Sequence, residues 1–289
     1  MLGSTTPRSR RRLPWGAGPP YTQRVPGIYV GTSGYSYADW VGPVYPPGTQ
    51  QREFLGLYAR EFAFVELNFS FYTRPRAEQL ARMADRTGEG LLFSLKTHQS
   101  LTHERAEDPA AEAALLREAI RPLVERSRLA AVLAQLPFSF HYDVPSRLYL
   151  DRLCRSLDGL PLAVEFRNRG WQRESVVQAL SERGVAFVNV DQPDLPDLLE
   201  ASEAATADMG YIRLHGRNSA NWWTGDNASR YDYLYSNAEL EGWVERMRAI
   251  LRRARTLLVA FNNHFRGQAV QNARMMKGLL VQHGLGPVG

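Results

Sequence analysis

Eight short apolar runs recur along this chain, and their regular alternation with helical segments most constrains the fold. The runs, rich in Val, Ile, Leu and Phe, cover residues 28–33, 64–69, 91–96, 131–136, 162–167, 185–191, 211–215 and 257–262. Most intervals between them carry apolar residues at helical spacing, as in Leu240, Trp243, Met247 and Leu251. Eight strand–helix units without a linker-like break predict one α/β domain over residues 27–289, a single (β/α)8 TIM-type barrel.

An open, doubly wound sheet is the alternative arrangement of the same elements. Such a sheet usually carries a glycine-rich phosphate loop after its first strand. Here the segment Gly31-Thr32-Ser33-Gly34-Tyr35 lacks both the dinucleotide-binding spacing and the lysine of a phosphate loop. The closed barrel is therefore the favoured prediction.

The net charge of +5 resides in the first 26 residues. This segment is rich in Pro, Gly and Arg, contains five arginines and has no acidic residue, so residues 27–289 carry 30 cationic and 30 anionic side chains. Lacking apolar periodicity, residues 1–26 are predicted to be a disordered arm. A phosphate-binding tail and a twin-arginine export signal are its functional alternatives, but residues 14–20 are not the apolar segment that an export signal needs.

The composition also limits the cellular setting. No stretch approaches the roughly 18 to 20 apolar residues of a membrane span, and the mean hydropathy is −0.36. Cys154 is the only cysteine, so no intramolecular disulfide can form. We therefore expect a cytoplasmic protein without a membrane partner.

Polar residues recur at every second position near the ends of five predicted strands. These pairs are Glu66 with Asn68, Ser94 with Lys96, Glu165 with Arg167, Asn189 with Asp191, and Arg213 with His215. The alternate positions, such as Val65, Val188 and Val190, are apolar and suit the layer beneath the helices. The polar faces are thus predicted to line the barrel interior. With Ser33, Gln135 and Asn262, every strand then ends in a polar group at the mouth where barrel enzymes hold their sites.

Six of these polar residues are charged, three of each sign. They are Glu66, Lys96, Glu165, Arg167, Asp191 and Arg213. Buried charges must be paired or await a ligand, so the alternatives are a self-neutralised structural network and a catalytic or binding site. A network spread over five strands is costly for stability alone, which favours a site.

The residue types suggest roles within such a site. The predicted catalytic residues are the carboxylates Glu66, Glu165 and Asp191 as acid/base groups, His215 as a proton relay, and Lys96. Lys96, Arg167 and Arg213 would clamp an anionic substrate. A divalent metal on Glu66, Glu165, Asp191 and His215 is an alternative, which the adjacent cations oppose, so no cofactor is expected. A Schiff base on Lys96 is another alternative; the chain's only other lysine is Lys277.

Two predicted loops are rich in aromatic residues. One holds Tyr35, Tyr37, Trp40 and Tyr45, and the other holds Trp222, Trp223, Tyr231, Tyr233 and Tyr235. Such rings can stack on a sugar or a nucleobase, close as a lid, or simply pack on one another. The predicted substrate-binding residues are Ser33, Tyr35, Trp40, Asn68, Gln135, Arg167, Arg213, Trp222, Asn262 and His264.

Several ordered segments resemble one known family. They are residues 31–37 with Trp40, 65–72, 163–167 with Trp171, 211–217 and 262–269, and together they are similar to the signature blocks of the YecE-like family, domain of unknown function 72. The resemblance runs from about Gly27 to the last predicted helix and implies a TIM-type barrel. It brings no settled substrate or reaction. Its proposed similarity to sugar isomerases and to an apurinic endonuclease rests on fold, and this chain lacks the many metal-binding histidines of that endonuclease.

These observations favour an enzyme, with a metal-independent hydrolase, lyase or isomerase expected. Its substrate would be a small anionic or polyhydroxylated, sugar-like molecule. The alternatives are a nucleic-acid-binding or phosphodiester-processing protein using the arginine-rich arm and aromatic loops, and a non-catalytic ligand sensor. The neutral charge of residues 27–289 disfavours nucleic acid as a partner.

Overall fold

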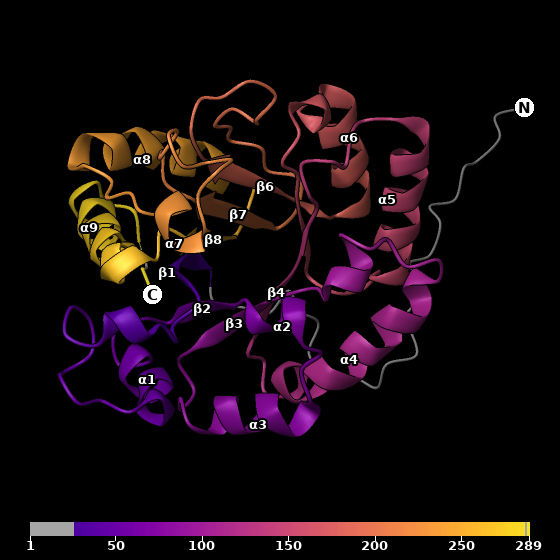
Figure 1. The fold of residues 1–289 in the computed structure, drawn as a ribbon. Helices are drawn as coiled ribbons and strands as arrows, with labels where there is room; N and C mark the ends of the chain where they lie inside the picture. The colour runs from indigo at the N-terminus through magenta and orange to yellow at the C-terminus, as the bar shows by residue number, and fades with distance from the viewer. Residues whose placement is uncertain (1–25, 287) are drawn as a thin grey trace, which may run out of the picture.

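The structure, a computed structural model, describes residues 26–286 and 288–289, and within them eight parallel strands close into one barrel in sequence order (Figure 1). The strands are β1 (Gly27–Ser33), β2 (Phe64–Leu67), β3 (Leu92–Lys96), β4 (Leu129–Gln135), β5 (Leu162–Glu165), β6 (Ala186–Asp191), β7 (Met209–Leu214) and β8 (Thr256–Phe261). The predicted (β/α)8 TIM-type barrel is confirmed. Apart from Pro26, the arm predicted over residues 1–26 lies outside the described residues.

Helices surround the strands and bury the outer face of the sheet (Figure 1). They are α1 (Gln51–Tyr58), α2 (Phe69–Tyr72), α3 (Ala77–Asp85), α4 (Pro109–Glu125), α5 (Val144–Ser156), α6 (Glu174–Arg183), α7 (Asn227–Arg230), α8 (Asn237–Leu251) and α9 (Gln268–Gln282). Short 3-10 helices occupy η1 (Ala38–Trp40), η2 (Gln99–Leu101), η3 (Arg169–Trp171) and η4 (Phe265–Gly267). None of the described helices is both long and apolar enough to cross a membrane.

Local sequence signals fix where several of these helices begin and end. Ser236 and Glu239 form a reciprocal capping box at the start of α8. Asp108 accepts hydrogen bonds from the first backbone amides of α4. Gly184 adopts φ = 64° just after α6, a left-handed conformation that lets the chain turn into β6.

The strand register brings polar side chains to neighbouring positions of the barrel wall. Ser33 lies opposite Glu66, and Glu66 lies opposite Ser94. Gln135 lies opposite Glu165. Paired positions of parallel strands share one face of a sheet, so β1 to β3 carry one polar row inside the barrel and β4 and β5 carry another. Between the rows the register pairs Ser94 with Ala131 and Lys96 with Leu133, and a hydrogen bond from Lys96 to Gln135 joins them.

The connection from β6 to β7 departs from the βα pattern, because the described residues 192–208 form no helix. This segment covers the barrel with hydrogen bonds as well as with buried apolar side chains such as Leu199. The amide of Asn189 bonds to the backbone of Ala204, with Nδ2 donating to its oxygen at 2.9 Å and Oδ1 accepting from its nitrogen at 2.8 Å. Thr206 Oγ1 accepts from the Phe187 nitrogen at 2.7 Å.

The polar face of β6 consequently points outward, opposite to the sequence prediction. Asn189 contacts the covering segment, and Asp191 contacts residues of the outer layer. By alternation, Val188 and Val190 face the barrel interior. The prediction reversed the two faces because it assumed an apolar helix over every strand.

Candidate active site

Arg213, at the centre of the barrel interior, joins carboxylates from two strands. Its Nε and Nη2 donate to Glu66 on β2 at 2.9 and 2.6 Å, and its Nη1 donates to Glu165 on β5 at 2.5 Å. All three side chains are almost completely buried. Burial disfavours the charged guanidinium, but the two carboxylates outweigh it and raise the pKa of Arg213. The predicted meeting of these three charges is confirmed.

Glu66 is fully occupied by donors from within the protein. Besides Arg213, its carboxylate accepts hydrogen bonds from the Tyr211 hydroxyl at 2.7 Å and from the Ser33 hydroxyl. Charge-assisted hydrogen bonds of this kind hold both partners in one geometry. Glu66 therefore orients Arg213, and no oxygen of Glu66 is left free for a proton-transfer role.

Glu165 has one oxygen in a different situation. Its Oε1 lies 2.7 Å from Arg167 Nε and 3.2 Å from His215 Nε2, yet none of these three buried atoms makes a well-aligned hydrogen bond. Burial raises the pKa of Glu165, but Arg167 and Arg213 overcome that effect and hold it well below its ordinary value. An ionised carboxylate, a guanidinium and an imidazole thus converge at the mouth with bonding capacity to spare.

His215 is held as a neutral ring between Asn262 and Glu165. Its Nδ1 lies 3.0 Å from the Asn262 amide nitrogen. When that nitrogen donates, the ring proton is on Nε2, on the side of Glu165. Burial and the neighbouring Arg167 lower the pKa of His215 to about 3. At neutral pH, His215 can therefore donate a proton in a hydrogen bond but carries no charge.

Lys96, at the end of β3, has no carboxylate partner among the residues that the structure describes. Its Nζ donates to Gln135 Oε1 at 2.9 Å and lies 4.4 Å from the ring centroid of Phe71. Burial and Arg213 lower the pKa of Lys96 to about 7, against the opposite influence of Glu66 and Glu165. A lysine of this kind is available as a neutral amine near physiological pH.

Asp191 lies outside this cluster, so the predicted meeting of all six charges is wrong. Its carboxylate accepts hydrogen bonds from Tyr235 at 2.8 Å, from Trp243 on α8 at 2.7 Å, and from Arg217 at 2.9 and 2.6 Å. These donors belong to the outer layer that the reversed face of β6 contacts. Arg217 neutralises Asp191 there, a pairing that the sequence did not indicate.

Because Asp191 lies outside the interior cluster, the cluster no longer has equal numbers of positive and negative side chains. The two carboxylates Glu66 and Glu165 now face three cationic side chains, Lys96, Arg167 and Arg213. The cluster carries a positive excess whenever Lys96 is protonated. The four-residue metal set proposed from the sequence is not assembled, and the described residues contain no group of three His, Cys, Asp or Glu side chains placed to hold a metal ion.

Two predicted substrate-binding aromatics lie in the packing around the first loop. Trp40 is completely buried, and its Nε1 donates to the backbone oxygen of His264 at 2.7 Å. The ring of Tyr35 packs against Tyr58 of α1, with 6.3 Å between centroids. For Tyr35 and Trp40 the structure therefore favours packing, which was the alternative interpretation of the aromatic loops.

Other aromatic rings do surround the mouth. Trp222 lies 5.8 Å from the Arg167 guanidinium and 6.4 Å from the His215 ring. Tyr231 is 6.3 Å from His215 and 5.6 Å from His264. Together these rings cover one side of the polar cluster.

Tyr37 and Asn68 continue the rim of the mouth beyond His264. Tyr37 stacks on His264 with 4.5 Å between ring centroids and donates to the Ser33 backbone oxygen. Asn68 Nδ2 donates to Ser33 Oγ at 3.0 Å, while its buried Oδ1 has no hydrogen-bond partner. The sequence placed Tyr37 and Tyr231 in aromatic loops but did not single them out from their neighbours.

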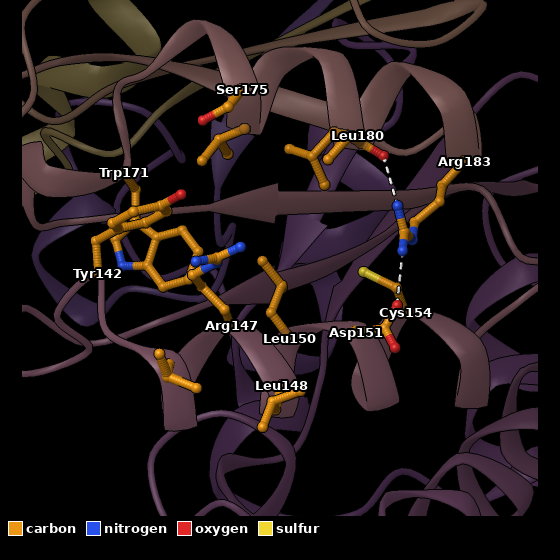
Figure 2. A pocket seen from close by; sticks show the side chains of 13 residues that line it. Tyr142, Arg147, Leu148, Leu150, Asp151, Cys154, Trp171, Ser175, Leu180 and Arg183 are labelled. Atoms are coloured by element: carbon orange, nitrogen blue, oxygen red, sulfur yellow. Dashed lines mark hydrogen bonds and ion pairs between the residues drawn. The ribbon is translucent and has the colours of Figure 1, made fainter.

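A surface hollow of about 370 Å³ lies away from the mouth, between α5 and α6 (Figure 2). Its lining is mainly apolar and includes Trp171, Leu148 and Leu180. Among its lining residues, Arg183 and Asp151 form an ion pair at 2.6 Å. The hollow lacks the convergent polar atoms of the mouth, so the mouth is the candidate site.

Comparison with known proteins gives one consistent result. The family model described as "Protein of unknown function DUF72" matches residues 29–287. The UPF0759 protein YunF of Bacillus subtilis (strain 168) is 29% identical over 272 residues, which cover 88% of this chain and 94% of that protein.

Solved structures agree with this match. A DUF72 family protein from Thermotoga maritima MSB8 is 40% identical with a TM-score of 0.83, covering 88% of this chain and 99% of that chain. A DUF72 family protein from Enterococcus faecalis V583 is 26% identical with a TM-score of 0.78, covering 88% and 95% respectively. The likeness therefore spans the whole barrel.

Proposed function

This chain belongs to the DUF72 family, and we propose that it is an enzyme that binds a small anionic substrate at the barrel mouth and transfers protons to or from it. The observation that carries this proposal is the convergence of Arg167, His215 and Glu165, whose facing polar atoms are buried and lack well-aligned hydrogen-bond partners. Buried polar atoms without partners are uncommon in folded proteins and are often completed by a ligand.

Arg167 is the proposed anion-binding group. Its side chain is 11% exposed, and within the described residues its only ion pair is the one to Glu165. A guanidinium presents several donors in one plane, which suits a carboxylate or a phosphate. Trp222 lies over the guanidinium and would shield the bound anion from water.

The remaining groups divide the proton chemistry. Lys96 can accept a proton near neutral pH, because its pKa is lowered to about 7. His215, which is neutral, donates a hydrogen bond from Nε2 to a substrate oxygen. Glu165 orients Arg167, Arg213 and His215, and its low pKa makes it a weak base. Metal-independent lyase, isomerase and hydrolase reactions all use such proton transfers.

The test is to measure the binding of phosphate and acetate by isothermal titration calorimetry. Arg167→Met should weaken binding about 10- to 100-fold, the value of one charge-assisted hydrogen bond. Arg169→Met is the matched control, because Arg169 lies two residues away, is 55% exposed and pairs with Glu200 at the surface. Equal affinities of the two variants would contradict the proposal.

A further inference from the structure

We propose that Lys96 is a covalent nucleophile that forms a Schiff base with the carbonyl group of a small oxo acid held at the mouth. The inference rests on the proposed function, because the carboxylate of the oxo acid is the anion assigned to Arg167. It adds a substrate class, a carbonyl compound carrying a carboxylate, and a covalent step.

The surroundings of the Lys96 amine suit a nucleophile. The amine makes one hydrogen bond, to the neutral acceptor Gln135, and no ion pair within the described part of the chain. A neutral amine that donates to Gln135 keeps its lone pair free for attack. Phe71, whose ring centroid is 4.4 Å away, presents an aromatic face that also stabilises a cationic iminium product.

The charged groups around Lys96 come from several strands and loops. Arg213 and Arg167 oppose its protonation, whereas Glu66 and Glu165 favour it. His103, in the loop after β3, is affected by Lys96 in turn, and burial lowers the pKa of His103 to about 4. Burial and these charges together favour a neutral Lys96 amine at pH values where an ordinary lysine is protonated.

The strand order places the amine and the anion-binding group within reach of one small molecule. Lys96 on β3 bonds to Gln135 on β4, and Gln135 lies opposite Glu165 on β5. Glu165 in turn contacts Arg167 at 2.7 Å. The amine and the guanidinium therefore lie on strand ends separated by one strand, β4, and Arg167 is near enough to influence the pKa of Lys96. This places both groups at one mouth, where a small oxo acid presents its carbonyl and its carboxylate.

The covalent step is balanced without an oxidant or a reductant. The neutral amine attacks the carbonyl carbon, a C–N bond forms as the C=O π bond breaks, and one proton of the nitrogen moves to the oxygen to give a neutral carbinolamine. Loss of the hydroxyl group as water leaves the protonated Schiff base. The proton that leaves with the hydroxyl group comes from solvent, and the neutral His215 ring donates a hydrogen bond from Nε2 to the departing oxygen.

The scarcity of lysine provides an internal control, because Lys277 is the only other lysine in the chain. Lys277 lies on α9, where its Nζ donates to the backbone oxygen of Glu61. The full chain would be incubated with pyruvate and sodium cyanoborohydride, which reduces iminium groups, and then mapped by peptide mass spectrometry. The expected result is one reduced adduct on Lys96, unchanged in Lys277→Arg and absent in Lys96→Met.

The position of the reduced adduct in the wild-type chain tests the Schiff base even if Lys96→Met fails to fold. Modification that is equal on Lys96, Lys277 and the terminal amine would overturn the Schiff base. Acetate should slow adduct formation by occupying Arg167. If acetate binds in an Arg167-dependent manner but neither pyruvate nor glyoxylate labels Lys96, the Schiff base is wrong and the anion site stands. If no anion binds, the proposed function fails as well.

Discussion

Arg213 and Glu66 form a bidentate ion pair in the barrel interior, with contacts of 2.9 and 2.6 Å and at most 2% exposure of either side chain. Such a pair does not by itself imply high stability, because removing both charges from water is costly. The ion pair with Glu66 holds the Arg213 guanidinium in a position from which it also donates a hydrogen bond to Glu165. The site is therefore preorganised before any ligand enters.

Breaking this pair should be far more damaging than breaking a surface pair. Glu66→Gln leaves Arg213 buried with only Glu165 as counter-charge, so we expect the free energy of unfolding to fall by about 3–5 kcal/mol. Glu203→Gln, which removes an exposed pair with Arg246, should cost at most about 1 kcal/mol. Urea denaturation measures both values, and similar losses would refute the structural role of Glu66.

His215 should make the protein sensitive to mild acid. Its pKa is about 3 in the folded protein against an ordinary 6.5, so the unfolded chain binds the proton first as the pH falls. Stability is then lost progressively below pH 6.5. Between pH 6.5 and 4.5, before most carboxylates protonate, the urea midpoint of His215→Gln should fall less than that of the wild type.

The control for this measurement is His283→Gln, which removes a surface imidazole that is 37% exposed. Parallel curves for His215→Gln and the wild type would show that the ring is not held neutral by burial.

Lys96 should make the stability of the protein depend on pH in the alkaline range. Burial lowers its pKa to about 7, so between pH 7 and 10.5 the unfolded chain binds a proton that the folded protein does not. The contribution of Lys96 to stability therefore becomes less unfavourable as the pH rises through this range. Subtracting the Lys96→Met curve from the wild-type curve, both measured by urea denaturation, should give a positive slope. A flat difference would mean that Lys96 is not desolvated.

Asp191 and Glu165 should behave differently on substitution. Asp191→Asn weakens contacts to Arg217, Tyr235 and Trp243, and we expect it to reduce stability by about 1–3 kcal/mol while phosphate binding at the mouth persists. Glu165→Gln removes a negative charge beside Arg167, so it should strengthen phosphate binding and abolish turnover. Calorimetry on both folded variants makes the comparison, and loss of binding in Asp191→Asn alone would reverse this assignment.

The fold could be predicted from the sequence because apolar runs of strand length and their alternation with helical segments reflect burial directly. All eight predicted strands are present, with ends that differ by a few residues. In β2, β3, β5 and β7 the polar face also lies inside, where Glu66, Lys96, Glu165 and Arg213 meet.

The sequence could not show which face of β6 lies inside. Period-two alternation separates two faces but does not orient them, and residues 192–208 gave no sign that polar backbone would cover that strand. Nor could it separate Tyr37 from Tyr35, since both lie in the same loop. Tyr37 reaches the mouth because its hydroxyl is anchored on the Ser33 backbone.

The helix-free connection after β6 has a consequence for exchanging strands between barrels. The Asn189 side chain pairs both backbone groups of Ala204, so a β6 strand with an apolar residue at position 189 would leave those groups unpaired. We therefore expect that β6 and residues 192–208 can be exchanged between homologous barrels only together. A chimaera that transplants both should fold, whereas one that transplants a helix-covered strand alone should not.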